Sequence, residues 1–458
     1  MLHCFTIYDE SFAFDSESGA LCKIDDISRE LLELWINSDG KKPDQAQVAA
    51  LASEKNWDLK ELDTANEEIS YLLEEGVFFA PKPEVKAEQL YPDKPRIKAM
   101  CLHICHDCNL RCRYCFAGTG DFGTGKRSML DWETGKAAID FLIQESGPRR
   151  NLDIDFFGGE PLMNWPLVKR LVEYCESEGP KHNKDIRLTI TTNCVLLDDE
   201  KIDYINEHFK NCVLSIDGRK EVHDHMRPNV GGQGSWDKVV SNIKKIVAKR
   251  KGEYYLRGTY TAYNKDFSED VLALAEIAPN LSIEPVVCSP DMPWALVKED
   301  LPQLKAEYEK LAKAILERRW EGKELNFFHF MLDGDHSPCL FKRLKGCGVG
   351  QEYCAVTPDG DIYPCHQLVG EEEFLLGNVL QGGLFKDAKR DDLQKRFSER
   401  LLQHPEVCEK CWARYYCGGG CAANAWHSSG DIMGTDEFSC ELLRKRIECA
   451  LWLQSKKG

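Results

Sequence analysis

The sequence has little that suits a membrane, a secretory route or a nucleic acid. No stretch approaches the roughly eighteen uninterrupted apolar residues that a membrane helix needs. The N-terminus, MLHCFTIYDESFAFDSE, lacks the basic start and apolar core of a secretory signal, so we expect an intracellular, cytoplasmic protein. Positive charge is in deficit, with 59 Lys and Arg against 76 Asp and Glu. The net charge of −17 disfavours binding to nucleic acid or to an anionic membrane.

Cysteine, by contrast, is abundant, with 21 among 458 residues. Disulfides are rare inside cells, so this number points to metal ligation or redox chemistry. Some cysteines stand alone in apolar segments, where we interpret them as buried thiols that pack as small hydrophobes. These are Cys4, Cys22, Cys175, Cys212 and Cys288. The functional cysteines are expected in the two segments where cysteines gather.

The length suggests two to four domains, and the pattern of residues divides the chain accordingly. Residues 1–80 contain short strand-like pieces and then three helical patterns, which predicts a small independent module. Residues 81–96 carry four prolines and are predicted to be a linker. In residues 97–322, strand and helix patterns alternate six times. This favours a parallel sheet partly closed into a barrel, a partial (β/α)6 fold. Residues 323–458 gain cysteines and lose periodicity, so we expect ligands to hold them together more than a hydrophobic core.

The segment CLHICHDCNLRCRYC offers two copies of one cysteine spacing. Cys101, Cys105 and Cys108 read C-x3-C-x2-C, and so do Cys108, Cys112 and Cys115. In the first copy, Cys101 and Cys105 fall on one face of a predicted strand, since strand side chains alternate. The second copy lies after that strand, at the edge where barrel enzymes carry their active groups. Three thiolates there can hold a [4Fe–4S] cluster and leave one iron without a protein ligand. Zinc would need a fourth ligand, and none is local. We therefore predict that the second copy is the catalytic metal site.

The cysteines of CNLRCRYC, with an aromatic residue before the third, resemble the cluster motif of the radical S-adenosylmethionine (SAM) superfamily. Three more motifs follow in order at the ends of predicted strands: GGEP, TTN, and LSIDG with HDHMR after it. In that family the GGEP backbone holds the amino group of SAM, and a serine and a later arginine contact its carboxylate and ribose. The resemblance therefore implies SAM contacts from Tyr114, Gly158, Gly159, Glu160, Thr192, Asn193, Ser215, Asp217 and Arg227.

The same resemblance implies the chemistry. A reduced cluster would bind SAM and cleave it with one electron to methionine and a 5′-deoxyadenosyl radical. The protein would orient SAM, exclude water and place one substrate C–H bond beside the radical. A small-protein or flavodoxin-type electron donor is implied as a partner.

The C-terminal cysteines resemble the twin-cluster SPASM extension of radical SAM enzymes that modify peptides. The PDG turn between AVT and IYP predicts a hairpin that brings Cys365 near Cys347. The resemblance implies three [4Fe–4S] clusters in all. The outer auxiliary cluster would be held by Cys408, Cys411, Cys417 and Cys440, and the inner one by Cys347, Cys365 and Cys421. Cys354 either completes the inner set or stands aside and leaves an iron open for a substrate thiolate. A zinc ribbon on Cys408 and Cys411 is the alternative.

The N-terminal module resembles the winged-helix-like, PqqD-like domain of enzymes that modify ribosomally made peptides. Such domains take a leader peptide as an added strand. A dimerisation or scaffold module is the alternative. The full domain order is most similar to the maturases of cysteine-dense peptides called SCIFF, which make thioether crosslinks. This implies a ribosomally made precursor peptide with a leader. Its cysteine sulfurs would be joined to backbone or side-chain carbons, with an auxiliary cluster taking the surplus electron.

Two other functions compete with this one. An anaerobic sulfatase-maturating enzyme shares the barrel and the SPASM cysteines. That family typically lacks the N-terminal module, and it has an aspartate after one cluster cysteine, where this chain has His366. A non-catalytic iron–sulfur scaffold would not need the motifs at the strand ends.

Overall fold

The computed structural model describes residues 1–84, 96–332, 346–402 and 406–457. Most of the predicted linker, residues 85–95, lies outside the described residues. None of the helices that the structure describes is long and apolar enough to cross a membrane.

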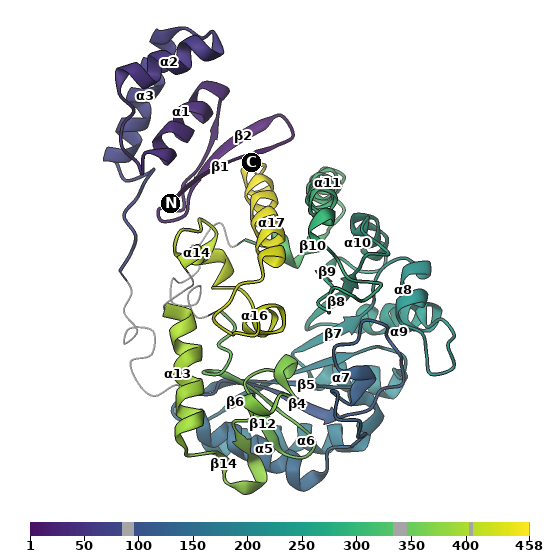
Figure 1. Ribbon diagram of the computed structural model, residues 1–458. Helices are drawn as coiled ribbons and strands as arrows, with labels where there is room; N and C mark the ends of the chain where they lie inside the picture. The colour runs from purple at the N-terminus through teal and green to yellow at the C-terminus, as the bar shows by residue number, and fades with distance from the viewer. Residues whose placement is uncertain (85–95, 333–345, 403–405, 458) are drawn as a thin grey trace.

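An N-terminal unit combines a three-stranded antiparallel sheet with three helices (Figure 1). Its elements are β1 (Leu2–Ile7), β2 (Glu10–Asp15), β3 (Leu21–Ile24), α1 (Asp26–Asn37), α2 (Gln45–Lys55) and α3 (Leu59–Glu74). Each helix follows an aspartate whose side chain accepts a backbone N–H of the first turn: Asp25, Asp44 and Asp58. These caps satisfy N–H groups that the helix itself leaves unpaired, and so they fix where each helix begins.

The two faces of this small sheet are buried against different partners. One face packs on the unit's own helices, in a core that includes Ala13, Leu31, Trp35 and Phe78. The other face carries Phe14 into the main core of the protein. Trp452 of the last helix donates a hydrogen bond to Glu10 at 2.9 Å. The predicted N-terminal module thus has a core of its own, and the rest of the chain covers one face of its sheet.

The middle of the chain forms six consecutive parallel strands. The strands are β4 (Ala99–Cys105), β5 (Asn151–Gly158), β6 (Asp185–Thr192), β7 (Asn211–Ser215), β8 (Glu253–Tyr260) and β9 (Asn280–Pro285). The helices between them are α5 (Trp132–Glu145), α6 (Trp165–Glu178), α7 (Asp199–His208), α8 (Lys220–Met226), α9 (Trp236–Lys249) and α10 (Phe267–Ala275). The long α11 (Leu301–Trp320) and the short β10 (Asn326–Phe327) follow. The predicted partial (β/α)6 core is confirmed.

The barrel does not close, because the C-terminal region continues the same sheet. The order is β10-β9-β8-β7-β6-β5-β4-β11-β12-β13-β14. The added strands are β11 (Tyr353–Val356), β12 (Asp361–Tyr363), β13 (Gly377–Asn378) and β14 (Gly383–Leu384). The strands β11 and β12 form the hairpin predicted around PDG. Since β11 pairs in parallel with β4, this hairpin lies directly beside the strand that leads into CHDCNLRCRYC.

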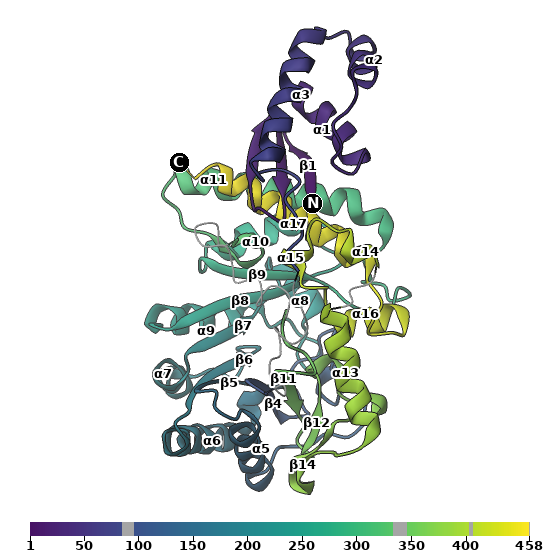
Figure 2. The ribbon, with the colours of Figure 1, turned by 90° about the vertical axis from the view of Figure 1, so that its left-hand side faces the viewer.

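The C-terminal region also contains substantial helices. They are α13 (Ala388–Leu402), α14 (Glu406–Glu409), α15 (Arg414–Cys417), α16 (Ala422–Ser429) and α17 (Glu437–Ser455). Figures 1 and 2 show α17 running between the N-terminal hairpin and α11. Apolar residues of this region, Phe374, Phe397, Ile447 and Leu451 among them, belong to the main core. The sequence predicts that ligands hold this region together more than a hydrophobic core does, and the structure shows that the region also contributes substantially to the main core. Charged residues interrupt the apolar ones in its helices and hide their periodicity.

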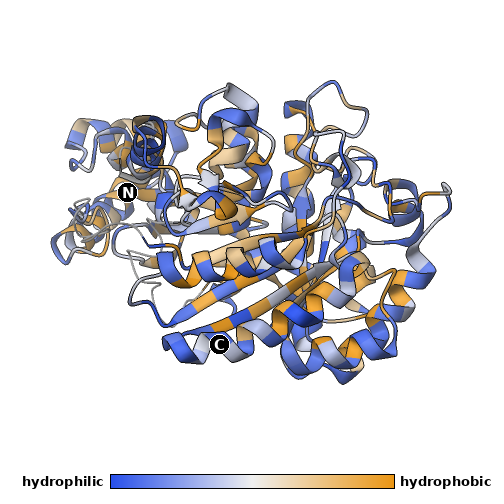
Figure 3. Cartoon of the chain, turned by 90° about the horizontal axis from the view of Figure 1, so that it is seen from below, coloured by the Kyte–Doolittle hydropathy of each residue, from blue (hydrophilic) through white to orange (hydrophobic). Residues whose placement is uncertain are grey.

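The helices around the sheet turn their apolar sides toward it. Figure 3 shows apolar residues along the central strands and on the helix sides that face them, with polar residues on the outer sides. Parallel strands end at one common edge, so this arrangement brings the segments after β4, β5, β6 and β7 together. The residues predicted to hold the catalytic cluster and SAM lie at the ends of these strands or in the segments that follow them.

Candidate functional site

The cysteine loop after β4 brings the second cysteine register together. Burial, with the nearby charges of Cys112 and Cys115 among the smaller causes, raises the pKa of Cys108 to about 12. Cys101 and Cys105 are buried on β4 instead. The Cys105 thiol donates to the carbonyl oxygens of Asp107 at 3.3 Å and Glu160 at 3.1 Å, so its sulfur is engaged within the protein. The geometry thus favours the register that begins at Cys108.

Two glycines let the GGEP segment pack against this loop, backbone on backbone. A Cβ added to Gly159 would lie 1.9 Å from the carbonyl oxygen of Asp107. At Gly158, whose φ is +116°, it would lie 2.3 Å from that of Cys105. Neither position tolerates a side chain, because the neighbouring atoms are backbone and cannot move aside. These glycines therefore position the cysteine loop, which is a structural task beside the SAM contact that the resemblance implies.

Glu160 joins the GGEP segment to the end of β6. Its buried carboxylate accepts hydrogen bonds from the Thr192 hydroxyl and the Asn193 backbone N–H, both at 2.7 Å. Burial raises its pKa to about 7, although these hydrogen bonds oppose the shift. Asn193 in turn extends its side-chain amide to the Cys108 sulfur at 3.6 Å. Glu160 and Thr192 thus act on the loop through Asn193.

A second buried network supports the loop from the β7 side. The Tyr114 hydroxyl donates to Asp217 at 2.8 Å and accepts from Arg227 at 2.9 Å. Burial raises the pKa of Asp217, and the charge of Arg227 opposes the shift. Arg227 lies close enough to Cys112 for its charge to oppose the rise that burial causes in the pKa of that thiol. Its Nε is buried and, among the described residues, has no hydrogen-bond partner. Ser215, at the end of β7, is half-buried.

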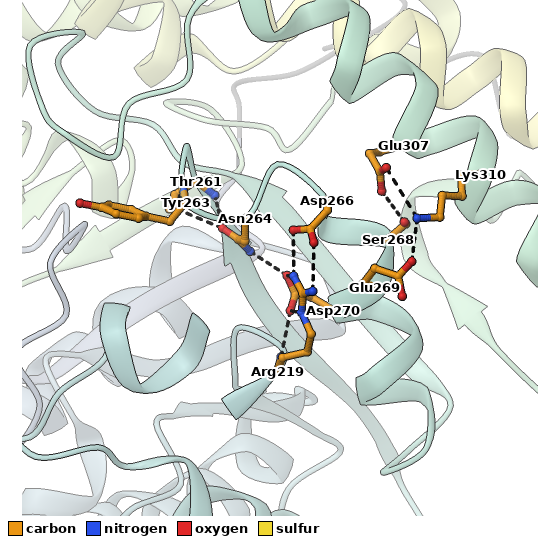
Figure 4. Close-up of polar contacts among 10 residues, drawn as sticks. All are labelled: Arg219, Thr261, Tyr263, Asn264, Asp266, Ser268, Glu269, Asp270, Glu307 and Lys310. Atoms are coloured by element: carbon orange, nitrogen blue, oxygen red, sulfur yellow. Dashed lines mark hydrogen bonds and ion pairs between the residues drawn. The ribbon is translucent and has the colours of Figure 1, made fainter. Parts of the chain in front are cut away.

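Arg219 fixes the segment after β7 and was not singled out in the sequence. Figure 4 shows its guanidinium between Asp266 and Asp270, with contacts at 2.8 Å to each. Asn264 donates to Asp270 at 3.0 Å. Together these contacts tie the Asp217 turn to α10. The sequence gives little indication of this role for Arg219. An arginine directly after the Asp-Gly at the end of a strand does not reveal that its ion-pair partners lie about fifty residues later.

The C-terminal cysteines form two sets. Cys408, Cys411, Cys417 and Cys440 line one pocket between α14, α15 and α17, and we call them the outer set. Burial raises the pKa of Cys417 to about 12, and the charge of Cys440 adds to the rise. All four cysteines that the resemblance assigned to the outer cluster are therefore neighbours.

Cys347, Cys365 and Cys421 form the inner set. Burial, with added effects from the charges of Cys421 and Cys347, raises the pKa of Cys365 to about 12. Cys365 lies just after the hairpin β11–β12, and Cys421 caps the start of α16. The predicted approach of Cys365 to Cys347 is thus present.

Cys354 does not join the inner set. It lies in β11, where its thiol is buried and close enough to Glu145 of α5 for that charge to raise its pKa further. Its neighbour Tyr353 instead lies close to Cys101 and Cys365. Because strand side chains alternate, Cys354 faces the helix layer while Tyr353 faces the barrel interior. Of the two possibilities for Cys354, the geometry favours the one in which it stands aside.

The donor sets fit iron–sulfur clusters. Within the described ranges, no three Cys, His, Asp or Glu side chains stand close enough to hold a single metal ion. A [4Fe–4S] cluster spreads its thiolate ligands over several irons, so its ligands stand farther apart than the ligands of a single zinc ion. Burial raises the pKa values of these thiols, so their ionised forms need positive charge nearby. The irons of a bound cluster would supply that charge. The unpartnered Nε of Arg227 likewise offers a donor to an anionic group beside Cys112.

Comparison with known proteins identifies two domains. Residues 102–256 match the radical SAM superfamily, and residues 347–412 match SPASM, an iron–sulfur cluster-binding domain. The chain has a radical SAM core and a C-terminal SPASM domain. Cys417, Cys421 and Cys440 lie beyond the matched SPASM segment, and the structure brings them to the other cysteines.

Two of the relatives that this chain matches are named as maturing enzymes. The chain is 24% identical over 341 residues to a cysteine-type anaerobic sulfatase-maturating enzyme of Clostridium novyi, covering 69% of this chain and 86% of that enzyme. It is 26% identical over 341 residues to the mycofactocin maturase of Mycobacterium ulcerans, covering 73% and 85%. An uncharacterized protein of Methanocaldococcus jannaschii is 33% identical over 139 residues, which span 30% of this chain and 45% of that protein.

Solved structures share the fold. The enzyme anSMEcpe, with bound AdoMet and the Cp18Cys peptide, superposes with a TM-score of 0.63 at 22% identity, covering 78% of this chain and 98% of that one. SuiB of Streptococcus suis, bound to SAM, gives a TM-score of 0.54 at 15% identity and covers 93% and 96%. The shared fold thus extends over most of the chain, up to 93% of it in the superposition on SuiB.

The barrel interior holds further polar groups, and of these sequence reasoning singled out only His366. Asp155 of β5 accepts a hydrogen bond from the Thr191 hydroxyl at 3.2 Å, and burial raises the pKa of Asp155 to about 7 although this hydrogen bond opposes the rise. Tyr353 and His366 approach at 3.3 Å between hydroxyl and Nδ1. Arg257 of β8 is exposed, and its charge influences both Asp155 and His366. The signal was available for Asp155 and Arg257, since each alternates with buried apolar residues along its strand.

Proposed function

We propose that this protein installs intramolecular thioether crosslinks in a ribosomally made, cysteine-rich precursor peptide. The observation that carries the proposal is the three-cysteine inner set. Cys347, Cys365 and Cys421 are neighbours. Cys354 faces one side of β11, and Tyr353, which lies close to Cys365, faces the other. A [4Fe–4S] cluster on three protein thiolates has one iron free to take a sulfur from the substrate. A cysteine-rich peptide supplies that sulfur.

Cys108, Cys112 and Cys115 would hold the catalytic cluster, and the strand-end residues would hold SAM. When bound, SAM and this cluster supply a 5′-deoxyadenosyl radical for hydrogen abstraction. The chain's own residues keep the cysteine loop in place. Gly158 and Gly159 admit its backbone, and Asn193 directs its amide to Cys108. Three clusters in all would also give the surplus electron a path away from the product.

The N-terminal sheet supports a peptide substrate. Its strand β3 (Leu21–Ile24) pairs only with β2 among the described residues, so its other edge is open to an added strand. A leader peptide can bind such an edge through main-chain hydrogen bonds. The opposite strand, β1, approaches the SPASM domain, where His3 stacks on Trp412 with ring centroids 4.0 Å apart. The leader would thus bind to a unit that is anchored to the catalytic part.

The test is turnover of the cysteine-rich peptide encoded beside the gene, by anaerobically reconstituted enzyme with SAM and a reductant such as reduced flavodoxin. Each thioether removes two hydrogen atoms from the peptide and protects one thiol from alkylation. We expect both changes, with 5′-deoxyadenosine formed in parallel. A peptide that keeps its mass and all its thiols would contradict the proposal, and absent 5′-deoxyadenosine would favour a non-catalytic scaffold.

A second candidate is oxidation of a cysteine to formylglycine, as in the sulfatase-maturating relative that this chain matches over 86% of its length. That reaction removes sulfur from the peptide, whereas crosslinking keeps it. Mass spectrometry therefore separates the two functions in one experiment. His366, which follows Cys365, stands where those enzymes typically carry an aspartate.

A further inference from the structure

Phe116 is an aromatic residue left half-open in the middle of the site. It directly follows Cys115, and 52% of it is exposed. Three rings nevertheless surround it, with centroid distances of 5.6 Å to His366, 6.0 Å to Phe122 and 6.5 Å to Phe157. The ring thus makes two edge-type contacts, with Phe122 and His366, and one stacked contact, with Phe157, and it still presents free surface.

Phe116, Phe157 and His366 come from three separate motifs, and Phe116 itself follows the last cysteine of CHDCNLRCRYC. Phe157 directly precedes the GGEP glycines, and His366 directly follows Cys365 of the inner set. The Phe157 and His366 rings also contact each other, with centroids 5.2 Å apart. His366 is itself held by the Tyr353 hydroxyl at 3.3 Å. The group therefore lies between the radical SAM cysteine loop and the inner set, where a substrate would have to meet both.

We propose that Phe116, Phe157 and His366 form an aromatic subsite that holds a cysteine side chain of the precursor core. Aromatic rings make favourable contacts with sulfur, and rigid rings lose little conformational entropy on binding. The free surface of Phe116 contacts the thiol and positions it for reaction at the inner set. This inference rests on the proposed function for the identity of the substrate. Phe116 is a positioning residue, distinct from the cysteines that would hold clusters.

Binding without turnover tests the subsite. The holoenzyme with SAM and no reductant is titrated with the precursor peptide and with a version in which every cysteine is serine. We expect Phe116→Ala to raise the Kd of the cysteine peptide about three- to tenfold and to leave that of the serine peptide unchanged. Phe116→Tyr should restore tight binding, because it keeps the ring. The matched control is Trp320→Ala, at the end of α11, where a 74% exposed ring is removed and neither Kd should change. Equal Kd values for wild type and Phe116→Ala would overturn the subsite.

Turnover adds a readout that a purely structural role would not move. Phe116→Ala should keep its iron content and still cleave SAM, but it should yield several-fold fewer modified peptides per 5′-deoxyadenosine. An unchanged ratio would overturn the positioning role. Any peptide modification counts in this ratio, so a product other than a thioether would contradict the proposed function and leave the subsite measurable. If wild type modifies no peptide, the binding titration alone decides on the subsite.

Discussion

The inner and outer cysteine sets lie in the same domain and differ in number and surroundings. The outer set has four cysteines around one pocket, with the cation Arg444 beside Cys411. The inner set has three, and its neighbours are the aromatic and polar side chains of the barrel interior, His366 and Tyr353. Four thiolates complete the ligation of a cluster, and three leave one iron available. A cluster whose irons all have protein ligands suits electron storage or a structural role. A cluster with one iron free of protein ligands suits chemistry on a substrate.

The largest effect is expected at the cysteine loop after β4, which carries Cys108, Cys112 and Cys115. Loss of one of these cysteines gives the reference against which changes at the inner and outer sets are compared. Cys112→Ala should lower SAM cleavage by more than about a hundredfold, because the catalytic cluster loses a ligand. Iron per chain should fall from about twelve to about eight. Iron and sulfide analysis with 5′-deoxyadenosine quantification measures both. Wild-type iron of about four with bound zinc would instead reduce the C-terminal cysteines to a structural ribbon.

Loss of one outer cysteine should lower the stability of the protein and leave SAM cleavage in place. Cys417→Ala leaves three of the four thiols in the pocket, so we expect loss of about four irons and a lower unfolding temperature. SAM cleavage should continue at the radical SAM loop, while peptide modification falls. Iron analysis, thermal unfolding and 5′-deoxyadenosine formation measure these changes. Full retention of iron would show that the outer set is not a cluster site.

Cys354→Ala asks directly whether the inner set has three or four ligands. Because the thiol faces α5, iron content and crosslinking should match wild type, and stability should fall by about 1 kcal/mol from the small cavity. The matched control is Cys175→Ala, another buried cysteine, which lies on α6. Loss of about four irons in Cys354→Ala but not in the control would make Cys354 a ligand and close the inner set.

The smallest effect concerns Asp155, in the polar interior beside the inner set. Its pKa is about 7 in the folded protein against 3.8 ordinarily, so the folded state binds the proton more tightly. Stability should therefore fall as pH rises through roughly 4 to 7, by on the order of 2 kcal/mol. Asp155→Asn should remove this dependence and be the more stable protein at pH 8. Urea unfolding at several pH values measures it, with Asp153→Asn on the same strand as the exposed control. Parallel pH profiles for wild type and Asp155→Asn would refute the shift.

Local patterns predicted much of the fold, and long-range pairing explains what they missed. The six strands follow from alternating strand and helix periods, and the cysteine loop follows from its compact spacing. The orientation of Cys354 depends on how β11 pairs with β4, about 250 residues earlier, which no local pattern contains. The rings of Phe116 and His366 meet for the same reason. The sequence alone does not show why position 159 must be glycine, because the constraint is its close contact with the Asp107 backbone.

The central claim is that the inner set leaves a position for a substrate sulfur. Pulsed electron paramagnetic resonance of the reduced enzyme, with a precursor peptide carrying ¹³C at its cysteine β carbons, tests it most directly. The account predicts a ¹³C hyperfine coupling in the auxiliary-cluster signal that persists in Cys354→Ala and disappears in Cys365→Ala. Absence of the coupling in wild type, with the peptide bound, would contradict the claim.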